Sequence, residues 1–405
     1  MSVLRLAWRN LWRNTRRTAI TLGAVVLGTT ILVLVRGLMD GMVAGAVRNA
    51  TDLLVGEAEV HAEGWLADRS LHQTVPHPGA VLAAADAAGV GATARSYAFG
   101  LVAHDTRSAG ALLWGVDPVR ERATVDLATH VETGAWLAET AAGGAVLGRK
   151  LARTLGVEVG DELVVVVQGA DGSLGNELFR VTGILGTVGE TVDRNAAILH
   201  RADWDELLVG GGRVHEIVLN ARGRLPLGEV AAVAERAAPG ADVRTWRQLL
   251  PMLADMLGMM DASLLIVGTV FGLAAGLGVM NTMLMATWDR MPELGMLKAI
   301  GTTPWRIARD VAAEALMLGV LGALAGAVVG GIGAWLLQRH GIDTRTFAGE
   351  TSIAGIPFDP IWRALLTPTT VVQPVLVMTA TCFLAALYPA LLAARLEPVR
   401  AMQRV

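Results

Sequence analysis

The segment Gly143–Lys150 is the part of the sequence that comes closest to a phosphate-binding loop. It reads GGAVLGRK, whereas the loop that cradles nucleotide phosphates has the pattern GxxxxGK followed by Ser or Thr. Arg149 stands where the lysine is required, and no Ser or Thr follows Lys150 to hold magnesium. We therefore expect no nucleotide site on this chain.

Three histidines, His61, His72 and His77, are the other residues that could be drawn together into a reactive centre. Their spacing matches no pattern of zinc ligands, and the sequence contains neither an HExxH motif nor a GxSxG turn. We interpret them as surface histidines. The single cysteine, Cys382, excludes an internal disulfide and a cysteine-rich metal cage. The sequence thus predicts a non-catalytic chain with no metal and no cofactor of its own.

The composition indicates that much of the chain lies in a membrane. Hydrophobic residues make up 53% of the 405 residues and charged residues only 18%, where about 25% charged residues is usual for a soluble domain. The shortage of charge is concentrated in a few windows. A formal net charge of -3 also removes the electrostatic case for a nucleic-acid partner.

Four windows are free of charge and long enough for a helix to cross ~30 Å of hydrocarbon, which takes about 20 residues. They are Thr18–Val35, Ala262–Trp288, Ala315–Gln338 and Val371–Leu392. No Asp, Glu, Lys, Arg or His lies inside them, whereas an ion-coupled carrier places such groups near the membrane midplane. We therefore expect four transmembrane helices and a source of energy outside them.

Basic residues in the short loops predict the orientation of these helices. The first 17 residues contain five arginines and no acid, and Lys or Arg also occurs in the connection 289–314 and in the tail 393–405. In the loop 339–370, three arginines are balanced by three acids. We expect both termini in the cytoplasm of a bacterium, and residues 52–241 and 339–370 on the outer side of its inner membrane.

The N-terminus itself, residues 1–17, is predicted to form an amphipathic helix at the membrane surface, because its apolar residues recur at helical spacing opposite the arginines. A cleaved signal peptide is the alternative, since Ala44-Gly45-Ala46 resembles a cleavage site. The apolar run is longer than the ~7 to 15 residues of a signal peptide, and Arg36 and Asp40 separate it from that site.

A large domain is predicted between the first two membrane helices. Short strand and helix patterns alternate over residues 52–241, which indicates an α+β domain with its own core. Apolar periodicity extends the flanking helices, residues 18–51 and 242–288, into a stalk. The predicted strands are Leu163–Gln168, Leu178–Leu185, Ala196–Leu199 and Val214–Leu219, and the predicted helices are Lys150–Leu155, Asp203–Leu208 and Leu227–Ala237. The expected fold is therefore an α-helical membrane protein with four transmembrane helices and a large α+β extracytoplasmic domain between helices 1 and 2.

Two further sets of residues suggest contacts. Gly322, Gly326 and Gly330 repeat every four residues in the third span, which predicts close helix packing. The hairpin after Gln168 contains an Asp-Gly pair and little apolar surface, so we expect it to project as a contact for a periplasmic partner or a second outer domain. A plain solvent-exposed turn is the alternative. The contact residues we assign to the hairpin are Gly169, Asp171, Gly172, Gly175 and Asn176.

The cytoplasmic connection carries a family resemblance. Residues 289–307 read DRMPELGMLKAIGTTPWRI, which resembles the R-x-x-E-[IL]-G-x-L-[KR]-A-[IL]-G segment of FtsX-like permeases, the membrane subunits of MacB-type and lipoprotein-releasing ABC transporters. Three other stretches resemble the same family. They lie before the first span, within residues 146–161 and at residues 389–399. Glu57–Trp65 looks like the opening of the outer domain in lipoprotein-release permeases. The resemblance covers the whole chain.

The resemblance implies partners that the chain itself does not contain. Members of this family work as two permeases, identical or homologous, bound to a dimer of a separate ABC ATPase, which holds the ATP and magnesium. In the lipoprotein-release branch, the permease passes lipoproteins from the outer leaflet to a periplasmic carrier. Two alternatives remain: a mechanotransmitting scaffold that regulates a cell-wall hydrolase, and a drug or peptide efflux permease.

Two sites follow from this interpretation. Flexible apolar side chains in the stalk are predicted to line an opening for acyl chains, because methionine adapts to varied apolar partners; these residues are Val35, Met39, Met42, Met256, Leu257 and Met260. Pro292–Ile300 is predicted to form a short helix with one apolar stripe that couples to the ATPase. The coupling residues are Glu293, Leu294, Gly295, Leu297, Lys298, Ile300 and Gly301.

Overall fold

The computed structural model describes residues 8–9, 11–343, 352–353, 356–357 and 361–395. The chain divides into two compact units. The helical unit consists of residues 1–44, 257–347 and 361–405, and the sheet unit consists of residues 45–256 and 348–360. Parts of the predicted N-terminal helix, outer loop and cytoplasmic tail lie outside the described residues.

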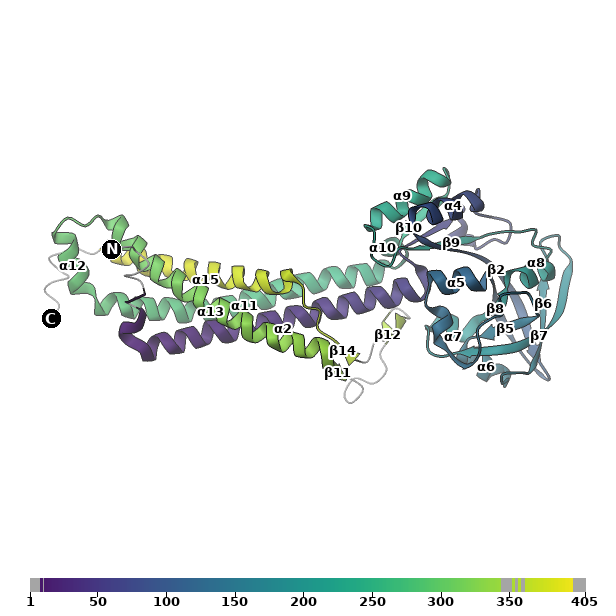
Figure 1. Cartoon of the computed structure of the whole chain (residues 1–405), viewed down its shortest axis with the longest axis horizontal. Helices are drawn as coiled ribbons and strands as arrows, with labels where there is room; N and C mark the ends of the chain where they lie inside the picture. The colour runs from purple at the N-terminus through teal and green to yellow at the C-terminus, as the bar shows by residue number, and fades with distance from the viewer. Residues whose placement is uncertain (1–7, 10, 344–351, 354–355, 358–360, 396–405) are drawn as a thin grey trace. The chain divides into compact units, whose positions relative to one another are not determined.

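Four long helices dominate the helical unit (Figure 1). They are α2 (Thr15–Ala50), α11 (Pro251–Asp289), α13 (Pro304–His340) and α15 (Pro368–Ala394). Each is long and apolar enough to cross a membrane, which agrees with the four predicted windows. Helices α2 and α11 each continue from one unit into the other.

Short elements connect these helices. The 3₁₀ turn η1 (Trp12–Asn14) precedes α2, the π-turn η2 (Thr51–Val55) follows it, and α12 (Met291–Ala299) lies between α11 and α13. Thr303 precedes α13 and Pro304 is its first residue, because proline suits a helix start, where its missing N–H costs nothing. Strands β11 (Ile342–Asp343) and β14 (Ile361–Trp362) pair with each other, as do β12 (Ser352–Ile353) and β13 (Ile356–Pro357).

A sheet of ten strands and the helices that cover it make up most of the sheet unit. The strands are β1 (Ala58–His61), β2 (Gly91–His104), β3 (Arg107–Val116), β4 (Val131–Gly134), β5 (Gly144–Leu147), β6 (Glu162–Gln168), β7 (Leu174–Leu185), β8 (Ala196–His200), β9 (Glu216–Asn220) and β10 (Asp242–Thr245). The helices are α3 (Trp65–Asp68), α4 (Pro78–Ala88), α5 (Pro118–Thr124), η3 (Leu127–His130), α6 (Arg149–Leu155), α7 (Glu190–Asn195), α8 (Arg201–Leu208), α9 (Leu227–Ala237) and α10 (Trp246–Leu249).

Strand β2 belongs to two parts of this sheet. Its second half pairs with β6, and β6 is joined through β7, β5, β8 and β3 back to β2, so these strands form a closed ring. Its first half pairs with β9, which continues to β1 and then β10. A core that includes Leu113, Leu163 and Phe179 is enclosed by the ring and by α6 and α8, and a second core lies under α4 and α9.

Among the predicted boundaries that differ from the structure, two have a clear local cause. Strand β7 begins at Leu174 rather than Leu178, because Gln168 already pairs with Leu174. The predicted stalk helix from residue 242 begins only at Pro251: residues 242–245 form β10, which pairs with β1, and Leu250 leaves the helical conformation, as a residue before proline tends to do.

Candidate functional site

An apolar groove of about 740 Å³ lies between α2, α11 and α15 of the helical unit. Leucines of α11 and α15 line much of it, among them Leu265, Leu273 and Leu384. Gly272 and Gly276 allow α15 to come close, because a Cβ added at either position would lie 3.3 or 3.1 Å from the Thr381 side chain. The volume falls within the ~300–1,000 Å³ of typical ligand pockets.

Arg36 is the charged member of the groove lining. Its guanidinium lies 3.0 Å from the Asp40 carboxylate one helical turn later, and the Thr370 hydroxyl donates to the same carboxylate at 3.0 Å. The groove is mainly apolar, although Thr269, Gln373 and Thr381 also line it, and Arg36 is the one cation among the described residues of its lining. This cation is able to contact a polar or anionic group of a ligand whose apolar part lies along the leucines.

The six residues predicted to line an acyl-chain opening lie elsewhere. None of them belongs to the lining of the groove. Val35, Met39, Met42, Leu257 and Met260 are partly buried in the helical unit, and Met256 belongs to the sheet unit.

Helix α12 exposes an apolar surface made of Met296, Leu297, Ile300 and the neighbouring Trp305, which we call the α12 surface. Ile300 and Trp305 are 78% and 77% exposed. The sequence predicted a different stripe, in which Leu294 shares a face with Leu297 and Ile300. Leu294 instead packs against the helical core, because at 3.6 residues per turn a residue six positions away has rotated about 120° out of line.

Two of the other predicted coupling residues, Glu293 and Lys298, bond α12 to distant segments of the same chain. Glu293 forms two hydrogen bonds with the Arg13 guanidinium, at 2.9 and 3.1 Å, and this partner lowers the pKa of Glu293. The Lys298 ammonium donates to the Ala394 carbonyl at 3.0 Å. Gly295, predicted to let a partner approach, is buried. Gly301 has φ +99°, so its backbone requires glycine.

Gly322, Gly326 and Gly330 lie against α2. A Cβ at Gly326 would be 2.6 Å from the Cβ of Thr29 and from the carbonyl oxygen of Val26. The other two glycines approach Val25 and Val33 with similar spacing, 2.7 and 2.9 Å. The stripe therefore sets the distance between α13 and the first candidate span.

The tip of the β6–β7 hairpin is smaller and less free than the sequence suggested. It closes over Gly169–Ser173, because the Asp171 carboxylate accepts from the Ser173 backbone N–H at 2.9 Å and from its hydroxyl at 2.5 Å. These bonds lower the pKa of Asp171. Ala170 donates to the Leu208 carbonyl of α8 at 2.8 Å. Gly172 lies in the loop, while Gly175 and Asn176 belong to strand β7.

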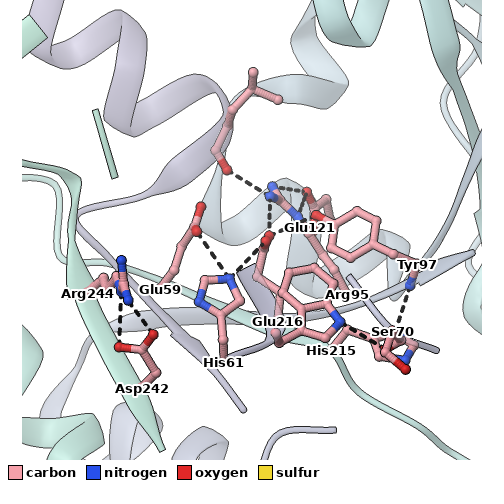
Figure 2. A network of polar contacts seen from close by, with 12 residues as sticks. Glu59, His61, Ser70, Arg95, Tyr97, Glu121, His215, Glu216, Asp242 and Arg244 are labelled. Atoms are coloured by element: carbon pink, nitrogen blue, oxygen red, sulfur yellow. Dashed lines mark hydrogen bonds and ion pairs between the residues drawn. The ribbon is translucent and has the colours of Figure 1, made fainter. Parts of the chain in front are cut away.

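A row of buried polar side chains crosses the other part of the sheet (Figure 2). His61 on β1 lies directly opposite Glu216 on β9, which lies opposite Arg95 on β2. Arg95 donates to Glu216 at 3.0 Å and to Glu121 of α5 at 2.6 and 3.0 Å. Glu59, two residues before His61, turns its carboxylate toward the same imidazole at 3.3 Å. The row thus alternates in charge and ties three strands to α5.

Burial and charge shift the pKa values in this row. Burial alone would lower the pKa of His61, but hydrogen bonds with Glu216 and Glu59 outweigh it and raise the pKa to about 9. Burial raises the pKa of Glu59, and the nearby charge of Glu216 adds to this effect. Burial opposes ionisation of Glu216 too, yet His61 and Arg95 together lower its pKa.

Aromatic rings cover the row. The Trp65 ring stacks between His61 and His215, with centroids 5.1 and 5.9 Å away. His215 accepts from the Tyr97 backbone N–H at 2.9 Å through Nδ1, so its Nε2 donates to the Leu71 carbonyl at 2.9 Å. The interpretation of His61 as a surface histidine is wrong, because its side chain is fully buried; His72 and His77 are exposed.

Sequence reasoning did not bring these polar residues together. Glu216 is 155 positions from His61, and only the strand order β1–β9–β2 makes them neighbours. The available signal was local: Glu59 and His61 alternate within an apolar strand and so share one face.

Comparisons with known proteins match both units. The MacB-like periplasmic core domain matches residues 18–248, and the FtsX-like permease C-terminal domain matches residues 265–398. The lipoprotein-releasing system transmembrane protein LolC of Xylella fastidiosa is 24% identical over 399 residues, covering 94% of this chain and 92% of the relative. A macrolide export ATP-binding/permease protein MacB of Marinobacter nauticus is 28% identical over 151 residues, or 37% of this chain and 21% of the relative.

Among solved structures, the periplasmic region of MacB from Actinobacillus actinomycetemcomitans is similar at 13% identity and a TM-score of 0.37, over 49% of this chain and 91% of that one. The two family matches leave residues 249–264 between them and together span most of the chain. The chain therefore belongs to the family of ABC transporter permeases that combine a MacB-like periplasmic core domain with an FtsX-like permease C-terminal domain.

Proposed function

We propose that this chain is the membrane subunit of an ABC transporter that takes lipoproteins or similar amphiphiles from the outer leaflet of the bacterial inner membrane and releases them toward a periplasmic carrier. The observation that carries this proposal is the groove between α2, α11 and α15. Its leucine walls suit acyl chains, and Arg36 suits a polar head. One relative, which is similar over nearly the whole chain, is named for lipoprotein release.

ATP is hydrolysed, in this proposal, by a separate ATPase dimer that docks on the cytoplasmic α12 surface. Exposed Met296, Leu297, Ile300 and Trp305 offer the apolar and aromatic contacts that interface centres favour. The chain carries no phosphate-binding loop: Arg149 replaces its lysine. A second permease, identical or homologous, completes the transporter, with both termini of each in the cytoplasm.

The groove and the predicted stalk opening are two locations for the acyl chain. The route by which the acyl chain enters remains our proposal for the stalk residues Met39, Met42, Leu257 and Met260. The groove is the place where the acyl chain then binds. The hairpin tip, Gly169–Ser173, remains a proposed contact for the periplasmic partner, although its attachment to α8 restricts how far it projects.

Photo-crosslinking in membranes tests the proposal. A crosslinker at Leu273, which is 62% exposed and lines the groove, is expected to capture an acylated protein. A crosslinker at Met42 reports on the stalk opening. Leu324 on α13 is the matched control, because it is 53% exposed and lies outside the groove lining.

Capture of the same acylated protein at Leu273 and Leu324, or of bilayer lipid alone at both, would contradict the assignment of the groove. A cell-wall hydrolase bound to the sheet unit, with no acylated protein at Leu273 or Met42, would instead support the scaffold function. Small drugs or peptides that compete with a groove crosslink would support efflux.

A further inference from the structure

The Glu59, His61 and Glu216 side chains converge in the sheet unit (Figure 2). The Nε2 atom of His61 lies 3.3 Å from an oxygen of Glu59 and 3.3 Å from an oxygen of Glu216, and the three atoms lie within 4.8 Å of one another. All three residues are buried: their exposed fractions are 5%, 0% and 6%.

These distances are long for hydrogen bonds between charged groups. An N–H of a charged donor usually lies about 2.7–2.9 Å from a carboxylate oxygen. Ligands that share one tetrahedral zinc ion, with bonds of about 2.0–2.1 Å, lie about 3.3–3.4 Å apart. The two distances from His61 Nε2 therefore also fit ligands that share one cation, and all three atoms lie close enough to surround it.

The Glu59 carboxylate supplies a second, independent indication. Among the described residues its polar contact is the one to His61 Nε2, at 3.3 Å, and no second N–H or hydroxyl group donates a hydrogen bond to it. A buried carboxylate ordinarily has such donors, because burial without them is costly. Glu216 differs, since its other oxygen accepts from Arg95 at 3.0 Å and from Tyr97 at 2.8 Å.

The local charge also favours a cation. A cation that binds Nε2 displaces the His61 proton, and the carboxylates of Glu59, Glu121 and Glu216 then face the single guanidinium of Arg95, which leaves two negative charges. The nearby Arg244 guanidinium forms its salt bridge with the Asp242 carboxylate, at 2.9 Å. One divalent cation on Nε2 and the two carboxylates would neutralise this excess.

We propose that Glu59, His61 and Glu216 bind one divalent cation of the zinc class, which fixes β1 to β9. One imidazole nitrogen and two carboxylate oxygens are a ligand set that suits Zn²⁺, and three protein ligands leave a fourth position for water. The set suits Ca²⁺ and Mg²⁺ poorly, because these ions prefer six or more oxygen ligands. The site is independent of the proposed transport function.

Zinc titration of the full chain in detergent tests this proposal. After chelator treatment, ZnCl₂ is added in competition with a chromophoric chelator, and the melting temperature of the sheet unit is followed in parallel. We expect one Zn²⁺ per chain and a higher melting temperature, with no such response to MgCl₂ or CaCl₂. His61→Asn and Glu59→Gln should each weaken Zn²⁺ binding by about 100-fold or more, since even second-shell changes cost about 10- to 100-fold.

Two matched controls make the same chemical changes at exposed positions nearby: His72→Asn and Glu63→Gln should bind Zn²⁺ like the parent chain. Should His61→Asn fail to fold, Glu59→Gln decides, because glutamine keeps the shape of the buried side chain and the carboxylate loses a polar contact to His61 alone. Binding of less than one Zn²⁺ per chain, or equal affinity in Glu59→Gln and the parent, would overturn the proposal. Loss of binding in His72→Asn would also overturn it, since the ion would then lie elsewhere.

Discussion

Replacing Gly326 with alanine should separate α2 from α13. The added Cβ would lie 2.6 Å from the Thr29 Cβ and from the Val26 carbonyl oxygen, whereas carbon atoms in contact lie about 3.5–4.0 Å apart. Relief of this clash requires a shift of about 1 Å, because both neighbours belong to a rigid helix and neither is the end of a flexible side chain. The shift would also strain the hydrogen bond from the Thr30 hydroxyl to the Gly326 carbonyl, now 3.2 Å long.

Overpacking of this kind costs about 1–3 kcal/mol, and we expect Gly326→Ala to lower the free energy of unfolding by that amount. Gly331→Ala on the same helix is the control, because nothing lies within 4 Å of its added Cβ. Alanine favours a helix over glycine by up to about 1 kcal/mol, so the control should be neutral or slightly stabilising.

The assay is equilibrium unfolding of the full chain in mixed micelles, with helix content followed by circular dichroism. Equal unfolding free energies for the two alanine variants would refute the argument that the glycine stripe sets the distance between α2 and α13.

The other two predictions concern the buried row and the α12 surface. Arg95→Ala should lower the free energy of unfolding by about 3–5 kcal/mol, because it leaves the buried Glu121 without its cationic partner and Glu216 with His61 alone. Arg120→Ala, which removes an exposed pair with Asp86, should cost about 0–1 kcal/mol in the same measurement. Ile300→Glu should release the ATPase from the complex during purification while the permease still inserts. Arg306→Glu, at an exposed site beside the α12 surface, is the control and should retain the ATPase. Retention of the ATPase by Ile300→Glu would contradict the proposal that the ATPase docks on the α12 surface.

The coupling segment shows how far sequence reasoning reached. Pro292, Lys298 and Gly301 predicted a short helix, and α12 spans Met291–Ala299. Local signals of this kind act over one or two helical turns, so a sequence reveals them. The direction of each side chain depends instead on what packs against the helix. The pairs Arg13–Glu293 and Lys298–Ala394 join segments far apart in the chain, and no local pattern predicts them.

The same contrast holds for the rest of the fold. The four membrane windows follow from length and absence of charge, and the predicted strand at Leu163–Gln168 matches β6 because its β-branched run is local. The closed ring of strands and the row from His61 to Arg95 depend on which strands become neighbours. That order is decided by the fit of whole faces in the core, which short patterns do not contain.

The pairing of β1 with β10 has a mechanical consequence. The chain enters β1 at Ala58 and leaves β10 at Thr245, and these two residues are directly paired. The two chain segments that enter and leave the ten-stranded sheet therefore start from the same end of one antiparallel ladder. Tension that pulled these connections apart would unzip the ladder one bond at a time, beginning with the bond from the Trp246 N–H to the Glu57 carbonyl. Tension along the strands would have to shear all of its bonds together. The domain thus resists stretching along β1 far better than it resists the spreading of its two connections.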